Sequence, residues 1–144
     1  MQKDTSEILR QLNLSPDFQS FYHENKDYMV DKSLAQLLAQ MLQQTGISKA
    51  TAIKNAEMSE VYGYHIFAGT RTPERGKVLA LAIGMGLNLE QIQQLLKAAD
   101  YSPLYVKRPF DSIVLYGICK KMTVAQINEL LYDYNMETLG QTTL

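Results

Sequence analysis

Residue types that carry out catalysis or bind metals are sparse in this chain of 144 residues. The sequence has no glycine-rich phosphate loop, no nucleophile elbow and no His-x-x-x-His pair. His23 and His65 are far apart and share no metal-ligand spacing with other candidate ligands. Cys119 is the only cysteine, which excludes an intramolecular disulfide and a cysteine metal cluster. We therefore expect a protein that is not an enzyme and that needs no cofactor or metal, with Cys119 packed inside an apolar helix.

Charged side chains are a better guide to function, because they are unevenly distributed. Fourteen Lys and Arg against fifteen Asp and Glu give a net charge of −1, which is unfavourable for a protein that neutralises phosphates. Residues 1–31 hold three cations and six carboxylates, whereas residues 45–80 hold five cations and three carboxylates. The second segment is the better candidate for binding an anionic partner such as nucleic acid, although exposed lysines are often only a solvated surface.

The pattern of the basic segment predicts helix, turn, helix, loop and helix. Ser48 and Ser59 each precede a helical run, and a serine hydroxyl there bonds the free N–H groups of the first turn. The run after Ser59 stops at Gly69, and a polar loop follows in which Pro73 is suited to open the next helix.

Landmarks along residues 34–99 follow one another in a recognisable order. They are Gly46-Ile47-Ser48, Ser59, Ile66, Gly69, Pro73, the run Leu79-Ala80-Leu81-Ala82, Gly86-Leu87 and the pair Leu95-Leu96. In this order they resemble the lambda-repressor-like, or XRE/Cro-type, helix-turn-helix family, and residues 59–69 fit without a gap. The resemblance implies a five-helix core whose helix after Ser59 reads the major groove of DNA.

The same resemblance implies which residues contact base edges: Glu60, Val61 and Tyr64, with His65 near the edge. Glu60 can accept from cytosine N4, Val61 can touch a thymine methyl group, and Tyr64 can reach a base or a phosphate. His65 would donate to a phosphate, and it gains charge as the pH falls below about 6.5.

Phosphate contacts are expected on both sides of this helix. Each lysine or arginine placed on a phosphate releases counterions, so binding should weaken steeply with salt. The expected contacts are Lys49 and Thr51 before the helix, and Thr70, Arg71, Arg75 and Lys77 after it.

Two positions depart from the family pattern. Glu57 stands where the turn often has glycine, and Gly63 occupies a place usually held by a core aliphatic residue. Glycine inside a helix costs about 1 kcal/mol relative to alanine. We expect Tyr62 or Tyr64 to fold over the gap, in which case that tyrosine packs and does not read bases. Affinity per subunit should then be modest, and dimerisation would raise it.

The chain outside this core divides into two further parts. Residues 1–32 form an N-terminal helical segment, in which a second helix carries an apolar stripe of Phe18, Phe21, Tyr22 and Met29. We expect this segment to pack on the domain, and an acidic arm that competes with DNA is the less favoured alternative. Residues 33–100 form the helix-turn-helix core, which opens with a helix that Ser33 caps and Gly46 ends.

Residues 101–144 contain a copy of residues 74–104. A shift of 35 residues aligns Ile92 with Ile127, Leu96 with Leu131 and Leu104 with Leu139. The sequence therefore predicts a second helical hairpin over about 109–139, which must stack on the first hairpin or on another subunit. Five tyrosines near this end favour a dimer interface, although core packing explains many of them equally well. They are Tyr101, Tyr105, Tyr116, Tyr132 and Tyr134.

Together these patterns predict an all-α fold: a lambda-repressor-like five-helix core, an N-terminal helical segment and a C-terminal helical hairpin. The function implied is a sequence-specific regulator of transcription that binds double-stranded DNA, most simply as a homodimer. The alternative is a non-enzymatic adaptor that uses the same fold to hold another protein. No apolar run approaches the roughly 20 residues of a membrane span and no secretion signal is evident, so we expect a cytoplasmic protein with no membrane partner.

Overall fold

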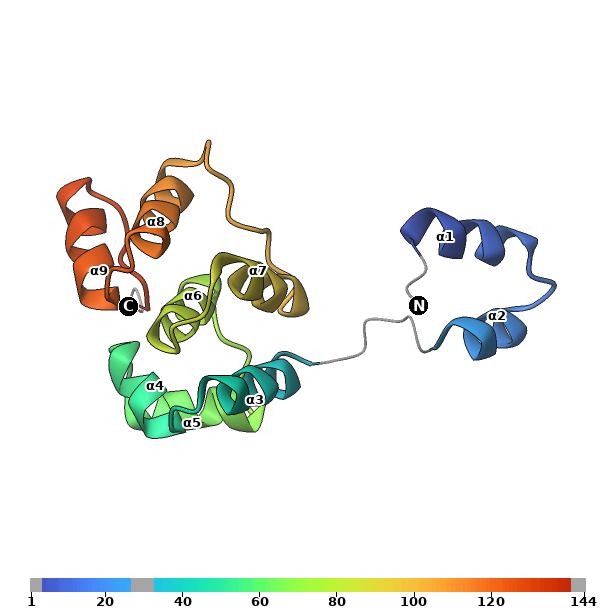
Figure 1. Cartoon of the computed structure of the whole chain (residues 1–144), viewed down its shortest axis with the longest axis horizontal. Helices are drawn as coiled ribbons and strands as arrows, with labels where there is room; N and C mark the ends of the chain where they lie inside the picture. The colour runs from blue at the N-terminus through green and yellow to red at the C-terminus, as the bar shows by residue number, and fades with distance from the viewer. Residues whose placement is uncertain (1–3, 27–32, 141–144) are drawn as a thin grey trace. The chain divides into compact units, whose positions relative to one another are not determined.

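The computed structural model describes residues 4–26 and 33–140, and these residues form helices without any strand (Figure 1). This confirms the predicted all-α class. The chain separates into two compact units, Met1–Asp31 and Lys32–Leu144. None of the described helices has the length and apolar character needed to cross a bilayer. The helices are α1 (Thr5–Leu14), α2 (Phe18–Asn25), α3 (Leu34–Thr45), α4 (Lys49–Asn55), α5 (Glu60–Ala68), α6 (Arg75–Gly84), α7 (Leu89–Ala98), α8 (Pro109–Cys119) and α9 (Val124–Asp133).

Local side-chain hydrogen bonds set most of the helix starts. Ser48 and Ser59 occupy the N-caps of α4 and α5, and each accepts from the backbone N–H three residues later. Gly46 and Gly69 end α3 and α5 in the left-handed conformation, as predicted. The expectation for Pro73 is wrong, because α6 begins at Arg75 with Glu74 as its N-cap. The carbonyl of Pro73 instead accepts a hydrogen bond from the Tyr101 hydroxyl, at 2.7 Å.

Helix α6 is the centre of the larger unit. Its residues Val78 to Ala82 are essentially buried, and it contacts α4, α7 and α9. A Cβ atom at Gly84 would lie 2.8 Å from the Ala52 carbonyl oxygen, so this glycine lets α4 and α6 cross closely. Buried apolar residues from α3 to Leu139 form one continuous hydrophobic cluster.

The predicted internal repeat has a structural counterpart. Helices α7 and α9 begin and end 35 residues apart, and both open with a capping box, Asn88 with Gln91 and Thr123 with Gln126. The second hairpin, α8–α9, stacks on the first, α6–α7, through contact between α9 and α6. Cys119, which was expected to be packed, lies exposed at the end of α8.

The described part of the N-terminal unit, residues 4–26, consists of α1 and α2, and the buried residues within it are Phe21 and Asn25. Asp17 caps α2, and hydrogen bonds from the Ser20 backbone and hydroxyl lower the pKa of the Asp17 carboxyl group. The predicted apolar stripe is present at Phe18, Phe21 and Tyr22, whereas Met29 lies outside the described residues.

Candidate nucleic-acid interface

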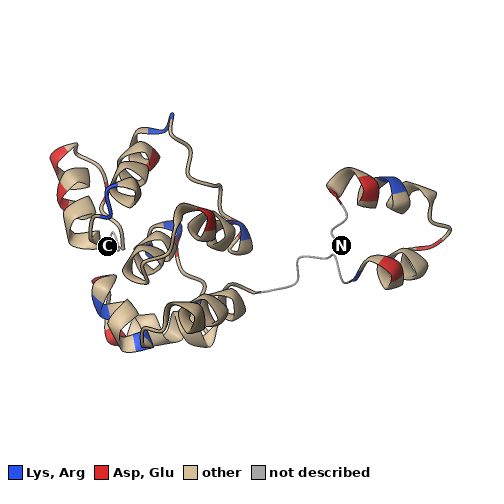
Figure 2. Ribbon diagram, viewed as in Figure 1, with Lys and Arg blue, Asp and Glu red and all other residues tan. Residues whose placement is uncertain are grey.

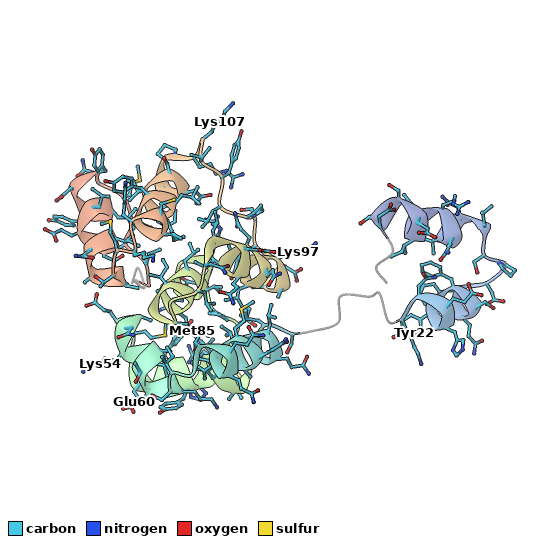
Figure 3. The ribbon with its side chains drawn as sticks, viewed as in Figure 1. Tyr22, Lys54, Glu60, Met85, Lys97 and Lys107 are labelled. Carbon is cyan, nitrogen blue, oxygen red and sulfur yellow. The ribbon has the colours of Figure 1, made fainter. Side chains whose placement is uncertain are left out.

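Helix α5 carries all four predicted base-contact residues on its exposed side. Gly63, Ile66 and Phe67 face the core, whereas Glu60, Val61, Tyr64 and His65 are exposed. Val61 keeps 71% of its surface accessible and Tyr64 keeps 41%. Figure 3 shows Glu60 and Lys54 at the outer edge of the α4–α5 layer. The exposed side of this helix therefore combines two ionisable residues, Glu60 and His65, with two large apolar ones, Val61 and Tyr64.

The turn before α5 depends on a non-glycine residue in a left-handed conformation. Glu57 has φ 57°, and its backbone N–H bonds the Lys54 carbonyl. This conformation costs an L-residue about 1 kcal/mol, which explains physically why a glycine is common at this place in the resembled pattern. The cost falls on folding stability and leaves the carboxylate exposed beside α5.

The structure explains why residue 63 is a glycine. A Cβ atom there would lie 2.5 Å from Cγ1 of Ile53, so the Ile53 side chain occupies the space beside the glycine. Helices α4 and α5 approach closely because of it. Ile53, and not a tyrosine, fills the space beside Gly63. Of the two tyrosines expected to pack there, Tyr62 does pack against the hydrophobic core, whereas Tyr64 remains exposed on the outer side.

Tyr62 is half-buried beneath two cations. The Arg71 guanidinium lies 5.5 Å from the ring centroid and the Lys77 ammonium lies 4.4 Å from it. Burial raises the pKa of the Tyr62 hydroxyl, and Glu74 raises it further. The ring thus stays a neutral phenol that cations can stack on.

Arg75, one of the predicted phosphate contacts, binds residues of its own chain. Its Nη1 and Nη2 donate to the two carboxylate oxygens of Asp111, at 2.9 and 3.0 Å. Nε donates to the Ser102 carbonyl and Nη2 also donates to the Pro103 carbonyl. Asp111 is 1% exposed, so this bidentate pair ties the second hairpin to the first.

Lys77 also binds its own chain. The residue is 7% exposed, and its ammonium donates to the Gly140 carbonyl at 2.8 Å. The structure thus gives Arg75 and Lys77 intramolecular roles in place of the predicted phosphate contacts.

Four predicted phosphate contacts remain exposed: Lys49, Thr51, Thr70 and Arg71. The Thr70 hydroxyl lies 2.8 Å from Nδ1 of His65, so these two residues form one polar pair at the end of α5. Lys54, which sequence reasoning did not place in the site, is also exposed on α4. Its position in the basic helix that precedes Ser59 was the available signal.

Exposed charges of both signs occur in the segment that holds α4 and α5 once Arg75 and Lys77, which bind their own chain, are left out. Figure 2 colours these cations and carboxylates blue and red along the ribbon. The exposed cations between residues 45 and 80 are Lys49, Lys54 and Arg71, and the exposed carboxylates are Glu57, Glu60 and Glu74. This surface is therefore neutral overall, although the sequence count for the same segment is basic.

Comparisons with protein-family models, curated proteins and solved structures find no match to this chain. Among residues 4–26 and 33–140, no three His, Cys, Asp or Glu side chains gather as metal ligands would. Function must therefore be inferred from the geometry of the chain itself.

Proposed function

We propose that the protein is a sequence-specific DNA-binding regulator in which α3 to α7 form a lambda-repressor-like core and α5 is the recognition helix. The main support for this proposal is the exposed side of α5. It is a short helix with a capped start and a buried rear side, and it presents Glu60, Val61 and Tyr64 outward. Such a helix fits the major groove and can offer polar and apolar contacts to base edges.

Backbone contacts would come from Lys49 and Thr51 on one side of α5 and from Thr70 and Arg71 on the other. Phosphate contacts position a reading helix, whereas base contacts supply specificity. Because the exposed charges balance, one subunit binds only modestly, and two subunits on two half-sites would bind much more tightly. A homodimer is therefore part of the proposal.

A second candidate function is that of a protein adaptor. The neutral charge of the α5 surface and its exposed Val61 and Tyr64 favour it, because protein interfaces are depleted of charge and enriched in aromatic residues. On this alternative, α5 contacts another protein and no duplex.

Salt-dependent binding to DNA distinguishes the two functions. We expect the full chain to retard a random duplex at low salt, with an affinity that falls as salt rises. The variant Lys49→Ala with Arg71→Ala should lower the slope of log affinity against log salt by about 2. Arg75→Ala is a poor probe, because it would break the pair with Asp111.

The matched control is Lys97→Ala with Lys107→Ala, which removes the same charge from positions that Figure 3 places away from Lys54 and Glu60. This control should keep the wild-type salt slope. No retardation at low salt would exclude DNA binding and favour the adaptor. An equal loss in both variants would show that the attraction is unspecific and that α5 is not the reading helix.

A further inference from the structure

The N-terminal hairpin α1–α2 is too small to be stable without a covering partner. Its helices have ten and eight residues, and isolated helices shorter than about 12 residues are marginal in water. Among its described residues only Phe21 is a buried apolar residue. Stability must therefore come from burial of further apolar surface.

The hairpin exposes that surface as one set of side chains. Leu9 and Leu12 on α1, and Phe18 and Tyr22 on α2, are between 43% and 66% exposed. The rings of Phe18 and Tyr22 are stacked, with centroids 6.0 Å apart and an interplanar angle of 27°. An exposed, pre-ordered aromatic pair is a common anchor of protein interfaces.

Helical phase places these four residues on the same side of the hairpin. The more buried residues are Glu7, Ile8 and Gln11 on α1, and Phe21 and Asn25 on α2, and they mark the sides on which the two helices face each other. Viewed down each helix axis, the exposed apolar residues are rotated in the same direction away from the inward-facing residues. The two helices run antiparallel (Figure 1). Both stripes therefore point to one side. We call this set, Leu9, Leu12, Phe18 and Tyr22, the apolar face.

Acidic side chains avoid the apolar face. By the same helical phase, Glu7 lies on the opposite side of α1, and Asp17 and Glu24 lie on the opposite side of α2. Two copies of the apolar face can therefore meet without bringing like charges together, as the core of an interface requires. A basic partner would instead need carboxylates around the face to complement it.

The area available suits a modest dimer. At roughly 200 Å² per large side chain, the apolar face offers about 400 Å² per chain. Two chains would bury about 800 Å² from these residues alone, so the surrounding polar residues need to add only about 200 Å² to reach the roughly 1,000 Å² of a specific interface.

We propose that the apolar face of α1–α2 pairs with the same face of a second copy of this chain, forming a symmetric four-helix bundle. This inference deepens the homodimer part of the proposed function by naming its surface. It does not depend on DNA binding, and its test uses no DNA, so either proposal can fail alone.

Sedimentation equilibrium of the full chain over a concentration series tests the pairing. Wild type should approach twice the mass of one chain, whereas Phe18→Ser with Tyr22→Ser should remain monomeric throughout. The matched control, Tyr132→Ser with Tyr134→Ser, removes two exposed aromatic residues from the tyrosine-rich C-terminal end, where the sequence favours a competing interface, and should dimerise like wild type. A monomeric control would place the interface there and overturn the proposal. A monomeric wild type, or a Phe18 and Tyr22 variant that still dimerises, overturns the proposal.

A charge-pair experiment covers the case in which the serine variant loses its helices. Leu12→Glu and Leu12→Lys should each be monomeric alone, because a charge then lies within the apolar face. Mixed in equal amounts, they should form a heterodimer, since opposite charges meet across the bundle. A mixture that stays monomeric while each variant keeps wild-type helicity overturns the pairing of like faces.

Discussion

The two helical hairpins of the larger unit share one local design but differ in burial. Leu81 of α6 is 0% exposed, whereas Tyr116, the equivalent residue of α8, is 54% exposed. The first hairpin, α6–α7, contacts both α4 and α9, whereas the second, α8–α9, packs on the larger unit mainly through α9 against α6. The comparison shows that local sequence sets the shape of a hairpin, whereas its position in the stack sets which residues are buried.

The two hairpins also make equivalent hydrogen bonds to the loops that follow them. The Gln93 side-chain amide bonds both backbone groups of Leu104, and the Asn128 amide does the same with Leu139. Each pair is separated by eleven residues and fixes the loop that follows its hairpin. The 35-residue repeat therefore includes the chain leaving each hairpin as well as the helices.

The joint between the hairpins is not part of the repeat. Arg75 and Asp111, which form it, correspond to Phe110 and Gly76 in the other hairpin. In the same way, Gly117 of α8 corresponds to Ala82, and a Cβ atom at Gly117 would lie 2.5 Å from Cδ1 of Ile127. The ion pair that joins the two hairpins and the close approach of α8 to α9 therefore depend on residues that the repeat does not share.

The largest expected effect comes from breaking this joint. Asp111→Ala leaves the Arg75 guanidinium and the Tyr105 N–H without their carboxylate, and loss of one partner of a buried pair costs about 3 to 5 kcal/mol. Urea unfolding should show this loss in the free energy of unfolding. Asp133→Ala, at an exposed residue of α9, should change it by less than about 0.5 kcal/mol. Similar stability of the two variants would mean that the hairpins are held together by apolar packing alone.

Equivalent residues of the two hairpins give the next effect. Leu81→Ala should lower the free energy of unfolding by about 2 to 5 kcal/mol, because it opens a cavity in the core. Tyr116→Ala should cost no more than about 1 kcal/mol, because about half of the residue is already exposed and its contact with the Lys120 ammonium lies at the surface. Thermal and urea unfolding of the pair measure the difference. A large loss for Tyr116→Ala would show that another surface covers α8 in solution.

The two loop-fixing amides give the smallest effect. Gln93→Ala should cost about 2 kcal/mol, because Leu104 is held between the hairpins and its backbone groups cannot easily reach water. Asn128→Ala should cost about 1 kcal/mol, because Leu139 lies close to the end of the described chain and can rehydrate. Amide hydrogen exchange at Leu104 and Leu139 would compare them directly, with Gln94→Ala as the exposed control. Equal costs would mean that both loops are equally constrained.

Sequence patterns were sufficient for the helices and most of their ends, although not for the start of α6, which lacks a side-chain cap. The caps at Ser48, Ser59 and Asn88 act over three residues, so the residue type and its spacing contain the required information. The exposed side of α5 also follows from helical spacing, and the structure exposes the four residues expected there. Whether they contact DNA stays a prediction that the salt experiment tests.

Only the tertiary structure decided which cations remain available at the surface. Arg75 bonds a carboxylate 36 residues away and Lys77 bonds a carbonyl 63 residues away, and neither partner can be inferred from the residues beside them. Residues 45–80 are therefore basic by sequence count, whereas their exposed charges sum to zero. Local hydrogen bonds determine where a helix begins, whereas the use of a charged side chain depends on distant groups that folding brings within reach.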